Sequence, residues 1–168
     1  MLKTPAADLR IEGAAGRGLS ATAELRLDAH DRVLISELQA NARVSIAELG
    51  RRVKLSQPAV RERLRKLEAA GVITSYRATV NYRALGYGIR AIVRLGRCDY
   101  GRVSRLLAKT PEVVNAFNVT GETSWVLEIV VVDVAHLDAV VSQFCTLAET
   151  STSIILKAPR EHQPVPPA

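Results

Sequence analysis

Residues 45–71 constrain the fold more than any other stretch of this chain, because they predict two helices joined by a tight turn. The first helix is expected over Ile46–Val53. Ser45 precedes it as an N-cap residue and Glu48 follows three positions later, the spacing of a reciprocal capping box. A short helix followed by a turn and a second helix is typical of a helix-turn-helix.

The second helix is expected to start at Ser56, a capping residue, and to end at Gly71, with Pro58 in its first turn. Its apolar residues recur at helical spacing and predict a buried stripe: Val60, Leu64 and Leu67. A different face carries polar and basic residues: Gln57, Arg61 and Arg65, with Arg63 and Lys66 beside them. A helix with one apolar face for the core and an opposite face of Gln and Arg is suited to enter a DNA major groove.

The positive charge of the chain is concentrated in this stretch. Residues 51–66 hold seven basic side chains and one acid, a net charge of +6, which equals the formal charge of the whole chain. From Arg83 to the end, nine basic residues stand against eight acids. A local positive field attracts phosphates and releases their counterions, so binding depends on salt. By itself the charge also fits a solvated helix face, but with the caps and the two-helix spacing it favours double-stranded DNA.

Composition narrows the remaining classes. With 168 residues, 48% of them hydrophobic, the chain can bury one large core or two small ones. Only 4% are aromatic, which argues against single-strand binding by base stacking. Cys98 and Cys145 lack metal-ligand spacing and are expected to be buried thiols. No window suits a membrane span, and charges interrupt the N-terminus where a secretory signal would lie, so a cytoplasmic protein is expected.

The chain is expected to divide into segments of different character. In order, they are a flexible N-terminal extension (1–26), a winged helix-turn-helix domain (27–82), a linker (83–88), a second domain (89–158) and an unstructured Pro-rich tail (159–168). The first domain should also contain a helix over Asp28–Ala40. Its wing should consist of a strand over Ile73–Val80 that returns near 81–85.

In the second domain the expected elements alternate. They are, in order, strand 89–95, helix 99–109, strand 113–120, strand 125–132, helix 133–148 and strand 153–156. This βαββαβ order predicts a ferredoxin-like sandwich with both helices on one face of the sheet, so the fold class is α+β. The other sheet face also carries apolar residues, for which a second subunit is the natural cover.

Several short motifs stand along the chain in a distinctive order: Leu27-Asp28-x-x-Asp31, Asn41-Ala42-Arg43-Val44-Ser45, Leu55-Ser56, Val60-x-x-Arg63-Leu64-x-x-Leu67-Glu68-x-x-Gly71-Val72-Ile73, Val119-Thr120-Gly121-Glu122 and Thr150-Ser151-Thr152-Ser153. With these motifs, the region from about Leu27 to Pro159 resembles the leucine-responsive/asparagine-synthetase regulator (Lrp/AsnC) family of prokaryotic transcription factors, in which a winged helix-turn-helix precedes a RAM-type domain. One departure is Lys54, where the family often has Gly in the turn between the DNA-binding helices.

The resemblance implies a homodimer, or a larger assembly such as a tetramer or octamer, that places two recognition helices in successive major grooves. Gln57 and Arg61 are then candidates for base edges, because Gln pairs with adenine and Arg with guanine. Arg65 is a candidate for a base or a phosphate. Phosphate contacts are expected from the residues around the helix start and beside it: Lys54, Ser56, Arg63 and Arg77. Pro58, in the first turn of the helix, is also expected to lie in the DNA-binding surface. For Arg63 the alternative is an ion pair with Glu62 or Glu68.

The resemblance also implies that a small effector, usually an amino acid, binds in the second domain. By position, the candidate residues are Thr120, Gly121, Glu122, Thr123, Ser124 and Thr152. The backbone N–H groups at Gly121 and the hydroxyls of Thr123, Ser124 and Thr152 can hold a carboxylate. A plain hairpin turn is the alternative. Family members often have an Asp soon after this glycine, followed by an aromatic residue. Here Thr123, Ser124 and Trp125 stand there, so the acid that would suit an ammonium group is missing.

Two other function classes compete with this reading. An enzyme is disfavoured, because the three histidines have no nucleophile or metal partner nearby in sequence and no phosphate loop, HExxH or GxSxG motif is present. No catalytic residue, metal site or cofactor is therefore expected. An architectural protein that wraps DNA with little sequence preference and no effector would use the same basic helix.

Overall fold

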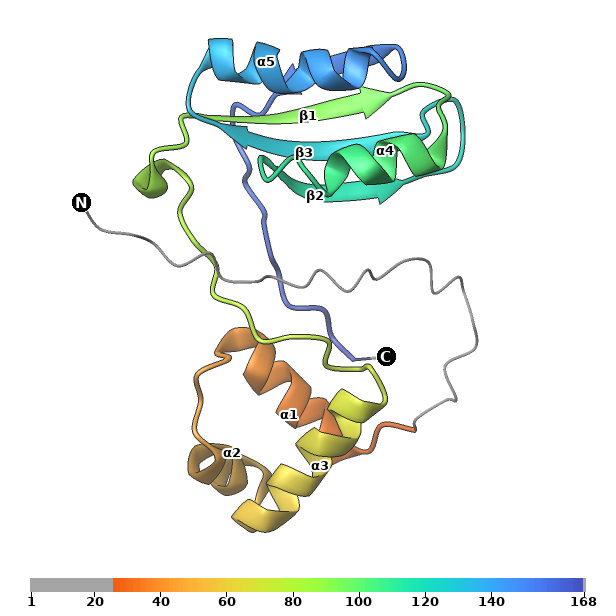
Figure 1. Cartoon of the computed structure of the whole chain (residues 1–168). Coiled ribbons are helices and arrows are strands. Elements are labelled where there is room, and N and C mark those ends of the chain that lie inside the picture. Colours follow the sequence, from red (N-terminus) through yellow and green to blue (C-terminus); the bar gives the residue numbers. More distant parts are fainter. Residues whose placement is uncertain (1–25, 168) are drawn as a thin grey trace, which may run out of the picture. The chain divides into compact units, whose positions relative to one another are not determined.

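The computed structural model describes residues 26–167, and the expected N-terminal extension (1–26) lies almost wholly outside them. The described chain falls into two compact units (Figure 1). Of the described residues, the first unit holds 26–77 together with 164–167, and the second holds Ala78–Gln163. Within the described part, no helix combines the length and the apolar character needed to cross a membrane.

The first unit is built from the three expected helices, α1 (Ala29–Ala40), α2 (Ile46–Val53) and α3 (Gln57–Ala69). A capping box starts α1: the Asp28 carboxylate accepts from the Asp31 N–H at 2.9 Å, and the Asp31 carboxylate accepts from the Asp28 N–H at 3.2 Å. The helices share one buried core, which contains Leu34, Leu49, Val53, Val60, Leu64 and Leu67. The predicted apolar stripe of α3 is therefore confirmed.

The predicted wing is wrong. Residues 73–80 form no strand, and the expected return contains a short 3-10 helix, η1 (Arg83–Leu85). The Asn81 side chain accepts from the backbone N–H groups of Arg83 at 3.0 Å and Ala84 at 3.3 Å, which turns the chain away from an extended conformation. Without a partner strand, the alternating pattern of Ile73–Val80 has no ladder to join. The same turn places a helix inside the expected linker.

The second unit follows the predicted βαββαβ order. Its elements are β1 (Ile89–Leu95), α4 (Tyr100–Leu107), β2 (Val113–Asn118), β3 (Trp125–Val131), α5 (Val134–Cys145) and β4 (Thr150–Ile154). The sheet order is β2-β3-β1-β4, and every neighbouring pair is antiparallel. The last strand starts three residues earlier than predicted, so Thr152 lies inside β4, opposite Val93 of β1.

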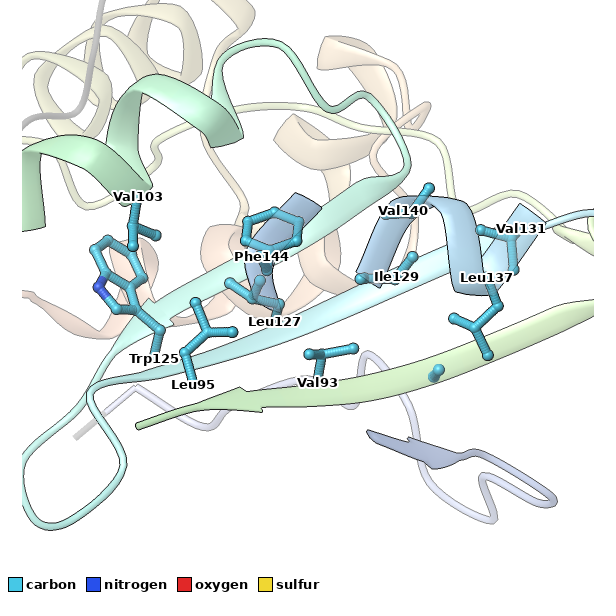
Figure 2. Packing of buried hydrophobic residues seen from close by; sticks show 11 residues of the cluster. Val93, Leu95, Val103, Trp125, Leu127, Ile129, Val131, Leu137, Val140 and Phe144 are labelled. Atoms are coloured by element: carbon cyan, nitrogen blue, oxygen red, sulfur yellow. The ribbon is translucent and has the colours of Figure 1, made fainter. Parts of the chain in front are cut away.

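One face of the sheet packs against α4 and α5. Alternate residues of β1 and β3 point to this face, as the period of two requires, and they are buried with residues of both helices. Figure 2 shows the Val103 side chain of α4 beside Trp125, and the Phe144 side chain of α5 near Leu127. The opposite face is only partly covered in a single chain: Val130 on β3 is buried, whereas Phe117 on β2 is 56% exposed. Val126, its cross-strand partner, is half-buried.

One smaller expectation also fails. Cys145 was expected to be buried but is exposed, with its Sγ 3.1 Å from the Thr150 hydroxyl, while Cys98 is half-buried; both are free thiols. The Cys145 error arises because it is the last residue of α5, where the helix face turns to solvent.

The described residues of the Pro-rich tail form no helix or strand. Val165 and Pro167 are nevertheless hydrogen-bonded to side chains of α1.

Candidate nucleic-acid interface

The turn between α2 and α3 is held in an unusual backbone geometry. Lys54 caps α2 in the left-handed region, with φ of 54° and ψ of 42°. Immediately after it, the Leu55 N–H donates to the Gly50 carbonyl at 2.9 Å. A Cβ on Gly50 would lie 2.7 Å from the Leu55 carbonyl oxygen, so only glycine permits this approach. The turn thus fixes how α3 leaves α2.

Both helices of the motif begin at serine caps, as predicted. The Ser45 Oγ accepts from the Glu48 N–H at 3.1 Å, and the Ser56 Oγ accepts from the Ala59 N–H at 3.4 Å. The predicted reciprocal bond from Glu48 back to Ser45 is absent. The Glu48 carboxylate instead pairs with Arg52, at 2.7 Å from Nε, and with Arg51.

The exposed front of α3 presents Gln57 and Arg61 together. Both are exposed, they lie one helical turn apart, and the Arg61 Nη2 is 3.5 Å from the Gln57 Oε1. At that distance the bond is weak, so both side chains can exchange it for other partners. Pro58, beside them in the first turn, is exposed and costs no hydrogen bond there. Ser56 and Lys54 are also exposed at this end of the helix.

The other basic residues of α3 are paired within the chain. Arg65 binds Glu62 with two hydrogen bonds, Nε at 3.0 Å and Nη2 at 2.8 Å, which raises the pKa of Arg65 and lowers that of Glu62. Lys66 lies 3.8 Å from the same carboxylate. These are exposed pairs within one helix and are weak in water. Arg65 can therefore leave Glu62 for a stronger anion.

Arg63 is paired with carboxylates other than the expected ones. Its Nη1 lies 2.6 Å from the Asp28 carboxylate and 2.8 Å from the Asp31 carboxylate, and not beside Glu62 or Glu68. Hydrogen bonds to Asp31 and Asp28 raise the pKa of the Arg63 guanidinium. The side chain is 30% exposed. Arg63 thus joins the middle of α3 to the capping box of α1.

Sequence reasoning missed two further contacts that hold this unit together. Arg52 of α2 pairs with Glu37 of α1 as well as with Glu48, so it links two helices. The Tyr76 hydroxyl donates to the Glu68 carboxylate at 2.7 Å and ties the segment after α3 back to that helix. Burial, followed by the bond to Glu68, raises the pKa of Tyr76 to about 12. No local pattern in the sequence signals either pairing.

The candidate effector residues fall in two places. The loop after β2 contains five of them, from Thr120 to Ser124, and Gly121 adopts φ of 109° there with open space around its Cα. The Ser124 N–H already donates to the Leu95 carbonyl at 2.8 Å. Thr152 lies in β4, the edge strand opposite β2, and is exposed.

The chain matches two family models, an AsnC-type helix-turn-helix domain over residues 27–68 and an Lrp/AsnC ligand binding domain over 91–165. It is 34% identical to the HTH-type transcriptional regulator Rv2324 of Mycobacterium tuberculosis, an alignment that covers 76% of this chain and 88% of that protein.

Solved structures agree with these matches. A feast or famine regulatory protein of M. tuberculosis, complexed with L-methionine, is 33% identical with a TM-score of 0.77 over 84% of this chain and 99% of that one. A transcriptional regulator of Neisseria meningitidis in complex with L-Met is 28% identical, with a TM-score of 0.76 over 83% and 96%. These matches agree with the structure, in which a helix with exposed Gln and Arg follows a glycine-dependent turn and precedes a four-stranded βαββαβ sheet. The chain therefore belongs to the Lrp/AsnC family of DNA-binding transcriptional regulators.

Proposed function

We propose that this regulator binds double-stranded DNA with sequence preference by placing α3 in the major groove. The observation that carries the proposal is the exposed pair of Gln57 and Arg61 at the N-terminal half of α3, held forward by a core that buries the opposite side of the helix. Gln can bond adenine bidentately and Arg can bond guanine bidentately. These two residues are the proposed readers of base edges.

The remaining polar and basic residues differ in whether their side chains are already paired within the chain. Lys54, Ser56 and Arg77 are exposed and are proposed to contact phosphates. The N-terminal turn of α3, with Pro58 outward, is proposed to face the DNA backbone. Arg65 is proposed to exchange Glu62 for a phosphate. Arg63 is withdrawn from this group, because Asp28 and Asp31 occupy its guanidinium; we propose that it sets the position of α3 instead.

The proposed functional form is a homodimer that assembles further. The partly exposed second face of the sheet supports it: one cross-strand row contains Phe117, Val126 and Arg94, and the next contains Ile92 and Glu128. An exposed phenylalanine beside half-buried aliphatic side chains is unfavourable in water and is relieved when a second copy covers the face. A dimer with two α3 helices would suit a near-palindromic DNA site.

We also propose that a small amino acid modulates this assembly through the loop Thr120–Ser124. Two structural relatives are complexes with L-methionine, which supports an amino-acid effector. Thr152 of β4 is proposed to belong to the same site. Effector binding can change DNA affinity only through its different affinity for two assembly states.

The known relatives are transcriptional regulators, so the proposal assigns a binding function to the chain and no catalytic residue, metal or cofactor. A regulator of this kind would act in the cytoplasm, where prokaryotic DNA lies. The competing proposal is an architectural protein that wraps DNA with little preference. The absence of the family's effector Asp gives that alternative its only specific support.

The deciding experiment is selection from a randomised double-stranded DNA pool at near-physiological salt, followed by sequencing. Enrichment of a short inverted repeat is the expected result, and binding without enrichment would favour the architectural function. The selected site is then tested with Arg61→Ala, expected to cost about 1–3 kcal/mol and to relax one base position. Lys66→Ala is the matched control, since Lys66 is exposed on another face of α3. Uniform weakening by Arg61→Ala on all sequences would refute the base contact.

A further inference from the structure

The chain end has a composition that stiffens it before it contacts anything. Residues 164–167 read Pro-Val-Pro-Pro, so Val165 carries the only backbone N–H in this segment. Each proline ring fixes its own φ, and each proline also restricts the preceding residue to extended conformations. Gln163, Val165 and Pro166 all precede prolines. The segment therefore favours an extended, polyproline-like conformation and loses little entropy when it binds.

This stiff segment is hydrogen-bonded to α1 at both ends. The Gln39 Nε2 donates to the Val165 carbonyl at 2.8 Å, and the Val165 N–H donates to the Gln39 Oε1 at 2.7 Å. One side-chain amide thus satisfies both backbone groups of Val165, as a neighbouring strand would. Two residues later, the Arg32 Nη1 donates to the Pro167 carbonyl at 2.9 Å. Arg32 and Gln39 are seven residues apart, two turns along one face of the helix.

The same chain end is anchored to the second unit just upstream. The Glu161 Oε1 lies 2.5 Å from the Arg90 Nη2 of β1, and this hydrogen bond lowers the pKa of Glu161. Arg90 is itself held by Glu128 and lies over the Tyr82 ring, 5.4 Å from its centroid.

We propose that the α1 face formed by Arg32 and Gln39 is a docking site for the chain's own Pro-rich end, residues 164–167, which we call the strap. The occupant is the segment of the same chain, because three side chain–backbone hydrogen bonds already receive it. This proposal does not depend on DNA binding.

The test is electron paramagnetic resonance of a nitroxide attached at residue 165 of the full chain. Val165→Cys is labelled in a background with Cys98→Ser and Cys145→Ser. The Val165 side chain is 70% exposed, so the label leaves the backbone contacts intact. A docked strap gives an immobile spectral component. Gln39→Ala should abolish that component, and Gln39→Glu, which still accepts from the Val165 N–H but no longer donates, should reduce it. Gln143→Ala, the same change at an exposed position on α5, should leave it unchanged.

Two results would overturn the proposal. One is a fully mobile spectrum when Gln39 is present, which would mean that the segment is not docked. The other comes from mixing labelled Gln39→Ala chains with unlabelled chains that keep Gln39 and Val165. If the immobile component returns on mixing, the segment docks on a neighbouring copy and not on its own α1. Thermal unfolding of each variant confirms that the compared chains are folded.

Discussion

The left-handed conformation of Lys54 predicts that Lys54→Gly stabilises the first unit. A residue with a Cβ pays about 1–2 kcal/mol to adopt the left-handed region, whereas glycine pays nothing sterically. Glycine loses more backbone entropy on folding, by roughly 0.5–1 kcal/mol. The difference leaves a net stabilisation of about 0.5–1 kcal/mol. For a unit of this size, that free energy corresponds to a rise in Tm of about 2–8 °C.

The assay is thermal unfolding of the full chain, followed by circular dichroism at the helical wavelength, with Lys54→Ala as the matched control. Lys54→Ala removes the same charge and side chain but keeps the Cβ, so it should show no comparable gain. The comparison therefore isolates the backbone conformation from electrostatic repulsion among neighbouring arginines. Equal unfolding temperatures for the glycine and alanine variants would refute the argument that Lys54 is strained. DNA affinity of both variants should fall alike, because both lose the proposed phosphate contact.

Other predictions test the turn, the segment after α3 and the sheet face. Gly50→Ala should destabilise the first unit by about 1–3 kcal/mol, because the new Cβ would lie 2.7 Å from the Leu55 carbonyl oxygen. Chemical denaturation measures this loss. The control Gly101→Ala, whose Cβ would lie 3.4 Å from side-chain atoms, should have a far smaller effect. The pKa of Tyr76 is raised to about 12 in the folded chain. Above pH 10 the unfolded state therefore binds fewer protons than the native state, so the free energy of unfolding should fall as pH rises toward 12. Tyr76→Phe should flatten that decline in unfolding experiments, and an unchanged slope would mean that another group causes it. Phe117→Lys should lower the oligomer mass in sedimentation experiments. Val134→Lys, at an exposed position on the helix side of the sheet, should leave that mass unchanged. Equal masses for these two variants would exclude the sheet face around Phe117 as the interface.

Elements defined by local chemistry were predictable from the sequence. Ser45 and Ser56 cap helices wherever they precede a helical pattern, because the bond from Oγ to the N–H three residues on closes within a single turn. The alternation in β1 and β3 and the stripe of α3 likewise reflect periods that hold whatever the tertiary contacts are. The α+β order and the helix-turn-helix therefore followed from the chain alone, as did the exposed position of Gln57 and Arg61.

Predictions failed where a residue's role depends on a partner distant in sequence. The charge of Arg63 was visible, but its partners, Asp28 and Asp31, were not, because nothing in the spacing indicates which carboxylates the folded chain brings within 3 Å. The wing prediction was wrong for the same reason, because a strand needs a partner strand. The expected partner near residues 81–85 instead forms a helical turn that follows Asn81.

The sequence by itself determined the helices, the strands and the polar front of α3, because caps and periodicity act over a few residues. Only the tertiary structure decided which charges are available to DNA, since a guanidinium is free or occupied according to the carboxylates that packing places beside it. It also decided what the chain end contacts. Prolines restrict the conformations of residues 164–167, but the side-chain amide that binds them belongs to Gln39, 126 positions away in the sequence.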